Sequence, residues 1–389
     1  FLRRGDLLVV NDTRVFPARL LGRRVPSGGN VECLLLARED PDARIEVAHP
    51  GEQIWSALVH PGQKLKPGSR MVFEARAATG ATDSTRATDH TDLRQATDDT
   101  DDTDLRRATD DTDLRRATDD TDLRRTTDDT DLRQATDDTV HKQATEDDTD
   151  DTEHPRALHA EILERQFFGR RRIRLWADEG SSIDAIVDAI GHVPLPPYIH
   201  RPDARADRER YQTVFADTRG SVAAPTAGLH FDRALLDALE TAGVTRATVT
   251  LHVGYGTFKP VRVDDIDDHV VDPEPYSISA ASAGAIDAAR GEGRRVIAVG
   301  TTTTRALEDA AIRGRGRVIA GPGEATVFIR PGFAFKAIDG LLTNFHLPRS
   351  SLLMLVSAFA GRERVLAAYV QAVARRYRFY SYGDAMLVV

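Results

Sequence analysis

The feature that most constrains the fold of this chain is an acidic nine-residue repeat between residues 78 and 154. Copies of Ala-Thr-Asp-Asp-Thr-Asp-Leu-Arg-Arg begin at Ala108 and Ala117, and variants begin at Thr126 and Ala135. Leucine is the only large apolar residue in a copy, so stacked copies would bury too little surface to offset the entropy of ordering the backbone. We therefore expect a disordered insert. The alternative is a segment ordered by calcium or by a partner, although the repeat lacks the glycines that calcium-binding repeats use to turn.

The repeat also separates two regions of opposite charge. Residues 78–154 contain 25 Asp and Glu against 10 Lys and Arg, whereas the rest of the chain contains 36 acidic and 42 basic residues. The net charge of -9 therefore conceals a basic remainder with a balance of +6. A positive surface is compatible with a polyanionic partner such as RNA.

The segments on the two sides of the repeat predict different architectures. Short apolar runs with Gly and Pro turns flank the repeat, a pattern typical of a small barrel or sandwich. After Trp176 the spacing i, i+3, i+4, i+7 predicts helices at Ile183 to Ile190, Leu235 to Ala242, Leu352 to Phe359 and Leu366 to Val373. Strands are predicted at Leu7 to Val10, Ala247 to Val253, Arg295 to Val299, Thr326 to Ile329 and Leu341 to Phe345. We expect a layered α/β domain from residues 1–30 and 175–389, with a small β domain at 31–174 inserted into it.

Composition excludes several classes of protein. A single cysteine, Cys33, excludes an intrachain disulfide and fits the cytoplasm. The longest apolar run, residues 352–360, is too short to span a membrane. The histidines lack a paired metal-ligand spacing, so we expect no metal. The chain opens on Phe1 just before a predicted strand, and we expect an N-terminal part of the α/β domain to be missing.

Polar residues follow four of the predicted strands, and carboxyl ends of strands are where α/β sheets bind ligands. The junctions are residues 11–14, 254–257, 300–305 and 343–346. A helix beginning after Gly300 would direct free N–H groups at an anionic ligand. The junctions contain neither a Walker A loop nor a complete dinucleotide fingerprint, and no nucleophile elbow is present.

The chain resembles the S-adenosylmethionine:tRNA ribosyltransferase-isomerase family of queuosine biosynthesis. Its signature is Tyr-Gln-Thr-Val-Phe at 211–215 followed by Gly-Ser-Val-Ala-Ala-Pro-Thr-Ala-Gly-Leu-His-Phe at 220–231. Further blocks lie at residues 5–19, 191–199, 251–258, 299–305, 343–361 and 377–386. The acidic repeat is not a family feature, and it falls in the region of the family's inserted barrel domain. Asp272 stands where the family commonly has the second histidine of His-x-Met-His-x-Glu.

The resemblance implies an enzyme that uses S-adenosylmethionine as a ribosyl donor. The family transfers and isomerises the ribosyl group onto 7-aminomethyl-7-deazaguanine in the tRNA anticodon loop, which yields epoxyqueuosine and releases adenine and methionine. The sulfonium acidifies the 5′ C–H, so the site needs a general base. His230 and His252 are the candidate catalytic residues, and Asp12 is a rival base or an orienting partner. No metal is required.

Co-substrate contacts are expected at the other matched strand ends. Gly300, Thr301, Thr302 and Arg305 would hold the methionine carboxylate, and Asn344 and His346 would read polar edges of adenine or deazaguanine. Gly254 and Gly256 belong to the matched turn after His252. The expected partners are tRNA and S-adenosylmethionine, with no membrane, and we expect a monomer.

Two arginine clusters are candidates for phosphate contacts with the tRNA, at 170–172 and at 375, 376 and 378. Tyr377, Phe379, Tyr380 and Tyr382 could stack on a splayed loop base, or could be core residues. Two other functions remain open, a non-catalytic RNA-binding relative and an S-adenosylmethionine-dependent transferase with a small-molecule acceptor.

Overall fold

The structure is a computed structural model that describes residues 1–40, 46–74, 157–166, 169–178, 180–254, 256, 261, 263, 265–266 and 269–389. The acidic repeat lies outside these residues. The fold is α/β and contains a closed six-stranded β-barrel, as the sequence predicts.

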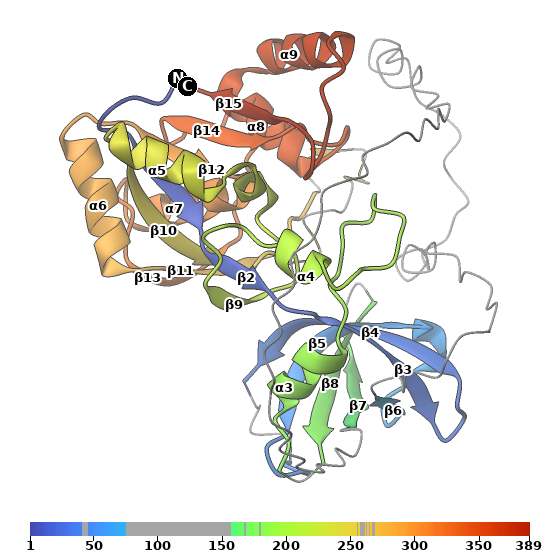
Figure 1. Cartoon of the computed structure of the whole chain (residues 1–389). Coiled ribbons are helices and arrows are strands. Elements are labelled where there is room, and N and C mark those ends of the chain that lie inside the picture. The colour runs from blue at the N-terminus through green and yellow to red at the C-terminus, as the bar shows by residue number, and fades with distance from the viewer. Residues whose placement is uncertain are drawn as a thin grey trace, which may run out of the picture. The chain divides into compact units, whose positions relative to one another are not determined.

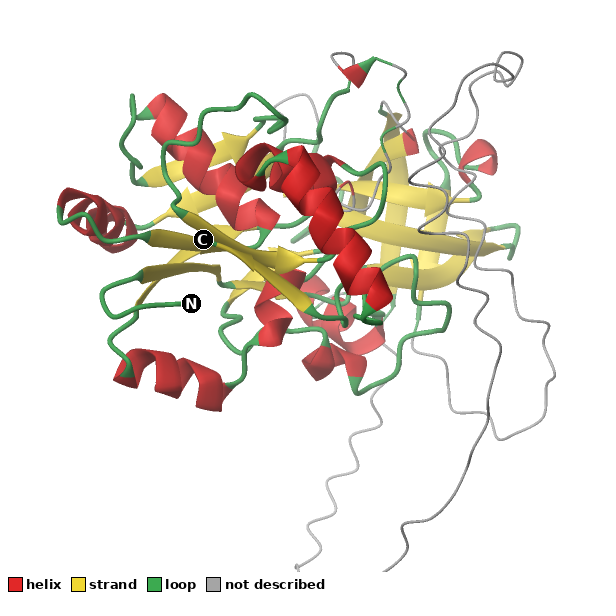
Figure 2. Cartoon of the chain, turned by 90° about the horizontal axis from the view of Figure 1, so that it is seen from above, coloured by secondary structure: helices red, strands yellow, loops and turns green. Residues whose placement is uncertain are grey.

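A seven-stranded sheet forms the α/β part of the chain (Figures 1 and 2). Its order is β13-β11-β10-β1-β12-β14-β15. These strands are β1 (Leu7–Asn11), β10 (Thr245–Leu251), β11 (Glu274–Ile278), β12 (Val296–Val299), β13 (Gly321–Ala325), β14 (Gly340–Asn344) and β15 (Ala385–Val388). β10, β1, β12 and β14 run parallel, and the outer strands β11, β13 and β15 are antiparallel to their neighbours. The four parallel strands therefore end at one edge of the sheet.

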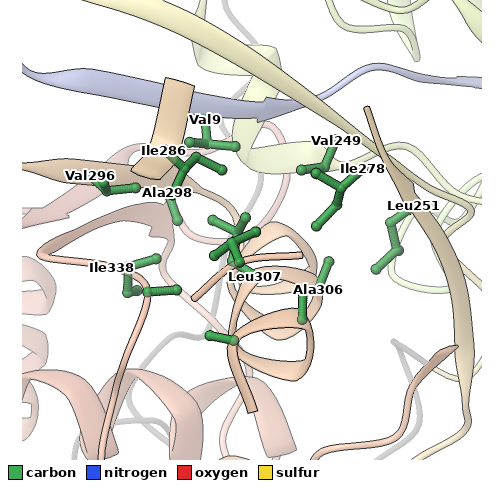
Figure 3. Close-up of a cluster of buried hydrophobic side chains, with 14 of the residues drawn as sticks. Val9, Val249, Leu251, Ile278, Ile286, Val296, Ala298, Ala306, Leu307 and Ile338 are labelled. Atoms are coloured by element: carbon green, nitrogen blue, oxygen red, sulfur yellow. The ribbon is translucent and has the colours of Figure 1, made fainter. Parts of the chain in front are cut away.

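Helices cover both faces of this sheet (Figure 2). The helices are α5 (Arg233–Thr241), α6 (Ala280–Gly291), α7 (Thr301–Arg313), α8 (Ser351–Ala360) and α9 (Arg362–Ala374). Because side chains alternate along β1, Val9 faces α6 and α7 whereas Val10 faces α5. Figure 3 shows the hydrophobic core on the α6 and α7 face of the sheet, where strand side chains gather around Leu307 of α7.

The barrel has the closed order β3-β4-β5-β8-β7-β6. Its strands are β3 (Arg19–Val25), β4 (Asn30–Glu39), β5 (Gln53–His60), β6 (Arg70–Phe73), β7 (Leu158–Arg165) and β8 (Arg170–Ala177), and a 3-10 turn, η1 (Gly62–Lys64), follows β5. Helix α3 (Ile183–Ile190), capped by the Ser182 side chain, contributes to the barrel core. Because the barrel is closed, it has no unpaired edge strand, whereas a two-sheet sandwich would have such edges.

Shorter elements connect these parts of the chain. They are β2 (Thr13–Val15), α4 (Asp207–Arg210), β9 (Thr218–Ser221) and the 3-10 helix η3 (Thr226–His230). β2 and β9 form a separate parallel pair next to the end of β1.

Some elements differ from the expectation. The barrel already includes β3, which lies before residue 31, and its core includes α3, which lies after residue 174. The strand predicted at residues 326–329 is absent, and the edge strand lies just before it, at β13. β11 and α6 were not predicted. The division into two domains with the expected boundaries stays a prediction.

Candidate active site

The carboxyl edge of the parallel strands gathers most of the candidate residues. β10 ends one residue before His252, β1 one residue before Asp12, and β12 one residue before Gly300. β14 ends at Asn344 itself. The order β10-β1-β12-β14 therefore sets these strand ends side by side.

Asn11 joins the ends of β1 and β10. Its Nδ2 donates to the Leu251 carbonyl at 2.9 Å, and its Oδ1 accepts from the backbone N–H groups of Leu251 at 3.0 Å and Thr13 at 3.1 Å. The buried amide is thus hydrogen-bonded at both ends, and it fixes the backbone directly before His252. Asn11 lies in a matched family block, but nothing along the chain indicates that the end of β10 is its partner.

His252 is half-buried and held on two sides. Its Nδ1 lies 2.8 Å from the Thr13 hydroxyl. A Cβ at Gly220 would lie 2.5 Å from the imidazole, so only glycine leaves room for the ring there. Burial lowers the pKa of His252, opposed by the charge of Asp12. The ring is therefore neutral near pH 7 and able to accept a proton.

Asp12 takes part in holding the turn after β1. Its Oδ1 accepts from the Thr250 hydroxyl at 2.6 Å, and its carbonyl accepts from the N–H groups of Asp217 and Thr218. Its carboxylate also acts electrostatically on His252. Both roles considered for Asp12, an orienting partner of His252 and a rival base, stay predictions.

His230, at the end of η3, is linked to β14 by a short hydrogen-bond chain. Its Nε2 lies 2.7 Å from Oδ1 of Asn344, whose Nδ2 donates to the Thr226 hydroxyl at 2.8 Å. Since an amide oxygen only accepts, Nε2 of His230 carries a proton, so in the neutral tautomer the lone pair is on Nδ1. Two of the expected residues, His230 and Asn344, are thus in direct contact.

The N-terminus of α7 has no side-chain cap. Gly300 adopts a φ of +93° at the N-cap position, a conformation that favours glycine. The backbone N–H groups of residues 301–303 have no acceptor among the described residues, although Thr301 and Thr302 are buried. A helix begins after Gly300, as the sequence predicts, and the binding of an anion by these N–H groups and the helix dipole stays a prediction.

The Arg305 side chain contacts β11 and residues at the end of β13 and just after it. It forms an ion pair of 2.5 Å with Glu274 of β11 and donates to the carbonyls of residues 272, 325 and 327. Four of its five N–H donors are therefore used within the protein. The expected contact of Arg305 with a carboxylate stays a prediction, and the structure shows a different use for this side chain.

The turn after His252 is described only in part, because residues 255 and 257–260 lie outside the described residues. Gly254 donates its N–H to the Glu274 carboxylate at 3.4 Å. A Cβ at Gly256 would lie 2.1 Å from a carboxylate oxygen of Asp272. The two glycines thus approach the acidic residues of the segment 272–274 closely, and their contact with a co-substrate stays a prediction.

His346 lies inside the protein. Its Nε2 is 2.8 Å from the Thr343 hydroxyl, and its backbone N–H donates to the Tyr369 hydroxyl. Burial lowers the pKa of His346 to about 4. The expected reading of a base edge by His346 stays a prediction, and in this structure the ring supports the turn between β14 and α8.

The buried His346 predicts an acid-sensitive stability. The unfolded chain takes up a proton below about pH 6.5 and the folded chain only below about pH 4, so stability falls as the pH drops through this window. Between pH 7 and pH 5 the contribution is about 2 kcal/mol. The His346→Gln variant should lose about that much less stability over this interval than the wild type, as measured by urea unfolding. An equal loss in both proteins would contradict the assignment.

Two further observations concern the described residues alone. No group of three His, Cys, Asp or Glu side chains there is arranged to hold a metal ion. None of their helices has the length and apolar character needed to cross a bilayer.

The fold defines an α/β protein with a candidate ligand site at the carboxyl edge of the sheet, and comparisons with known proteins specify the family. The family described as "queuosine biosynthesis protein" matches residues 1–388, so the chain belongs to that family.

Similar proteins carry a more specific name. An S-adenosylmethionine:tRNA ribosyltransferase-isomerase of Sorangium cellulosum is 42% identical over 100% of this chain and 85% of that protein. The protein of the same name from Thermus thermophilus is 40% identical over 100% of this chain and 86% of its own length. A crystal structure of an S-adenosylmethionine tRNA ribosyltransferase from Thermotoga maritima is 30% identical, with all of this chain and 84% of that one covered at a TM-score of 0.39.

Proposed function

We propose that this chain is an S-adenosylmethionine:tRNA ribosyltransferase-isomerase. It transfers and isomerises the ribosyl group of S-adenosylmethionine onto 7-aminomethyl-7-deazaguanine in a tRNA anticodon loop, with release of adenine and methionine. The names of relatives about 40% identical over the full chain support this function. We place the activity in the cytoplasm and in a monomer.

The observation that carries the proposal is the combination of two imidazoles and an uncapped helix N-terminus at one edge of the sheet. Ribosyl transfer from a sulfonium donor needs a base near the acidified 5′ C–H and a site for a carboxylate. His252, which is neutral near pH 7, is the base in this proposal. Burial suits that role because it keeps the imidazole unprotonated.

His230 has a separate task in the proposed reaction. The aminomethyl group of the acceptor is an ammonium in water and attacks only after it loses a proton. Asn344 accepts a hydrogen bond from Nε2 of His230, so the neutral tautomer of the ring has its lone pair on Nδ1. We assign to Nδ1 the removal of the ammonium proton, and to Asn344 and Thr226 the fixing of the ring.

We assign the binding of the donor's methionine carboxylate to the N-terminus of α7. The N–H groups of residues 301–303 supply a set of donors for the carboxylate, and the helix dipole adds a favourable charge. Gly300 keeps the approach to these donors open because it has no side chain.

Adenine release tests the proposed function. The protein is incubated with S-adenosylmethionine and a tRNA that carries the aminomethyl-deazaguanine, and free adenine is measured by chromatography. We expect adenine with this tRNA and none with the same tRNA carrying ordinary guanine. Adenine released with the free base alone would favour a transferase with a small-molecule acceptor, and tRNA binding without adenine would favour a non-catalytic relative.

A further inference from the structure

The structure distinguishes the two arginine clusters that the sequence left equivalent. In the barrel cluster, Arg172 is paired with Glu39 at 2.6 Å and with Glu164 at 3.3 Å. Arg171 is buried and donates to three backbone carbonyls, those of residues 62, 169 and 170. These two side chains are thus engaged within the barrel.

The cluster after α9 is different. The side chains of Arg375 and Arg376 are exposed and have no acceptor among the described residues. Arg378, also exposed, has one acidic neighbour, Asp384 at 3.6 Å. Two aromatic rings in this segment are also exposed, Tyr377 at 44% and Tyr382 at 48%. The segment 375–384 therefore combines two unpaired guanidinium groups with partly exposed aromatic rings.

This segment lies beside the candidate active site. The Tyr380 N–H donates to the carbonyl of Phe345, the residue after Asn344. β15, which begins directly after the segment, pairs Ala385 with Asn344. Asn344 holds the ring of His230 at 2.7 Å. The contact of this segment thus lies on the residue directly after the amide that orients a catalytic candidate.

The segment is held in one shape. The ring of Tyr380 packs against that of Tyr198 in a tilted arrangement with centroids 5.0 Å apart, and the Tyr198 hydroxyl donates to Ser381. The N–H of Arg378 donates to the Asp384 carboxylate at 2.7 Å. A surface that is ordered before binding loses less entropy when a ligand docks.

Arg376 occupies a position that usually belongs to glycine. It follows the last turn of α9 with a φ of +60°, its N–H donates to Val373, and the next N–H, of Tyr377, donates to Ala372. This is the Schellman arrangement, in which glycine is preferred because other residues are strained at positive φ. An arginine at this position is therefore suboptimal for stability.

We propose that the segment 375–384 is a docking surface for the single-stranded loop of the RNA substrate. Arg375 and Arg376 bind backbone phosphates, and the exposed ring of Tyr382 stacks on an unpaired base. Recognition of RNA loops combines these two contacts, phosphates held by cations and splayed bases stacked on aromatic rings. The proposal rests on the proposed function for the identity of the RNA as tRNA.

The test compares tRNA binding by the full chain in two charge-matched double variants. The first is Arg375→Ala with Arg376→Gly, and the control is Arg4→Ala with Arg246→Ala. Arg4 and Arg246 are exposed and lie at the opposite, amino edge of the sheet. The first variant should bind tRNA about tenfold more weakly, and its log Kd should depend less on log salt by about 0.7–0.9 per lost phosphate contact. The control should bind like the wild type.

Two further variants separate docking from folding. Arg376→Gly alone should raise the melting temperature by about 2–4 °C, because it relieves the strained φ, while it weakens tRNA binding. Tyr382→Leu should weaken tRNA binding about fivefold or more, the scale of one lost stacking contact. In both variants the affinity for S-adenosylmethionine and the kcat at saturating tRNA should be unchanged.

The outcomes separate this proposal from the proposed function. The proposal is overturned if the first double variant binds tRNA like the control, or if the wild type does not bind tRNA. A wild type that binds tRNA through these residues but releases no adenine would support the docking surface and contradict the proposed function.

Discussion

Replacement of His252 by alanine is expected to slow adenine release by about 10²-fold or more, the usual contribution of a general base. Affinity for S-adenosylmethionine should remain close to that of the wild type, because the ring is assigned a proton transfer and not a binding contact. The experiment is a single-turnover measurement of adenine release at saturating donor and tRNA, with donor affinity determined by calorimetry.

Two controls sharpen this prediction. Gly220→Ala keeps the imidazole but places a Cβ 2.5 Å from it, so the displaced ring should also slow adenine release. Burial lowers the pKa of His252, so the wild-type rate should decline with acidification only below about pH 6.5. Unchanged turnover in His252→Ala would contradict the assignment and would transfer the role of 5′ base to His230 or Asp12.

Replacement of Arg305 by alanine is expected to reduce the free energy of unfolding by about 3–5 kcal/mol, the cost of leaving one member of a buried ion pair without its partner. The side chains of Arg305 and Glu274 are almost fully buried. The Arg305 guanidinium also donates hydrogen bonds to three backbone carbonyls near β11 and β13. Chemical denaturation at neutral pH measures the loss.

The matched variant for this prediction is Glu274→Gln. It keeps a side-chain oxygen for the N–H of Gly254 but removes the charge opposite Arg305, so it should also lose stability. If Arg305→Ala were as stable as the wild type but bound S-adenosylmethionine with a loss of a few kcal/mol, the carboxylate contact expected from the sequence would be correct.

Arg305 shows the limit of sequence reasoning at this site. Its place five residues after Gly300 suggested a ligand contact, because the sequence shows neighbours along the chain and not across the sheet. Its partner Glu274 lies 31 positions away on an antiparallel strand that was not predicted. Asn11 was assigned no role for the same reason, since the strand end that it holds is 240 positions away.

The parallel strands were the most predictable part of the fold. β1 and β12 consist mostly of Val, Ile, Leu and Ala, and each of the four parallel strands has polar residues at its carboxyl end or within the next two residues. That pattern is sufficient to place His252, Gly300 and Asn344 at one edge, because parallel strands share a direction.

The outer strands β11 and β13 and the helix α6 escaped prediction for physical reasons. β13 reads Gly-Pro-Gly-Glu-Ala, which is a turn sequence that only pairing with β11 makes into a strand. β11 is short and contains Pro275. α6 consists largely of Ala, Ser and Gly, and Ile286 is the only large apolar residue on its buried face, so the helix lacks the repeated apolar spacing that marks an amphipathic helix.

The origin of the transferred atoms tests the central claim most directly. S-adenosylmethionine labelled in the ribose and, in a parallel reaction, in the methyl group is incubated with the protein and the tRNA that carries aminomethyl-deazaguanine. We predict that the ribose label enters the tRNA, with one adenine released per modified nucleoside, and that the methyl label remains in free methionine. Methyl label in the tRNA with S-adenosylhomocysteine as the product would contradict the account.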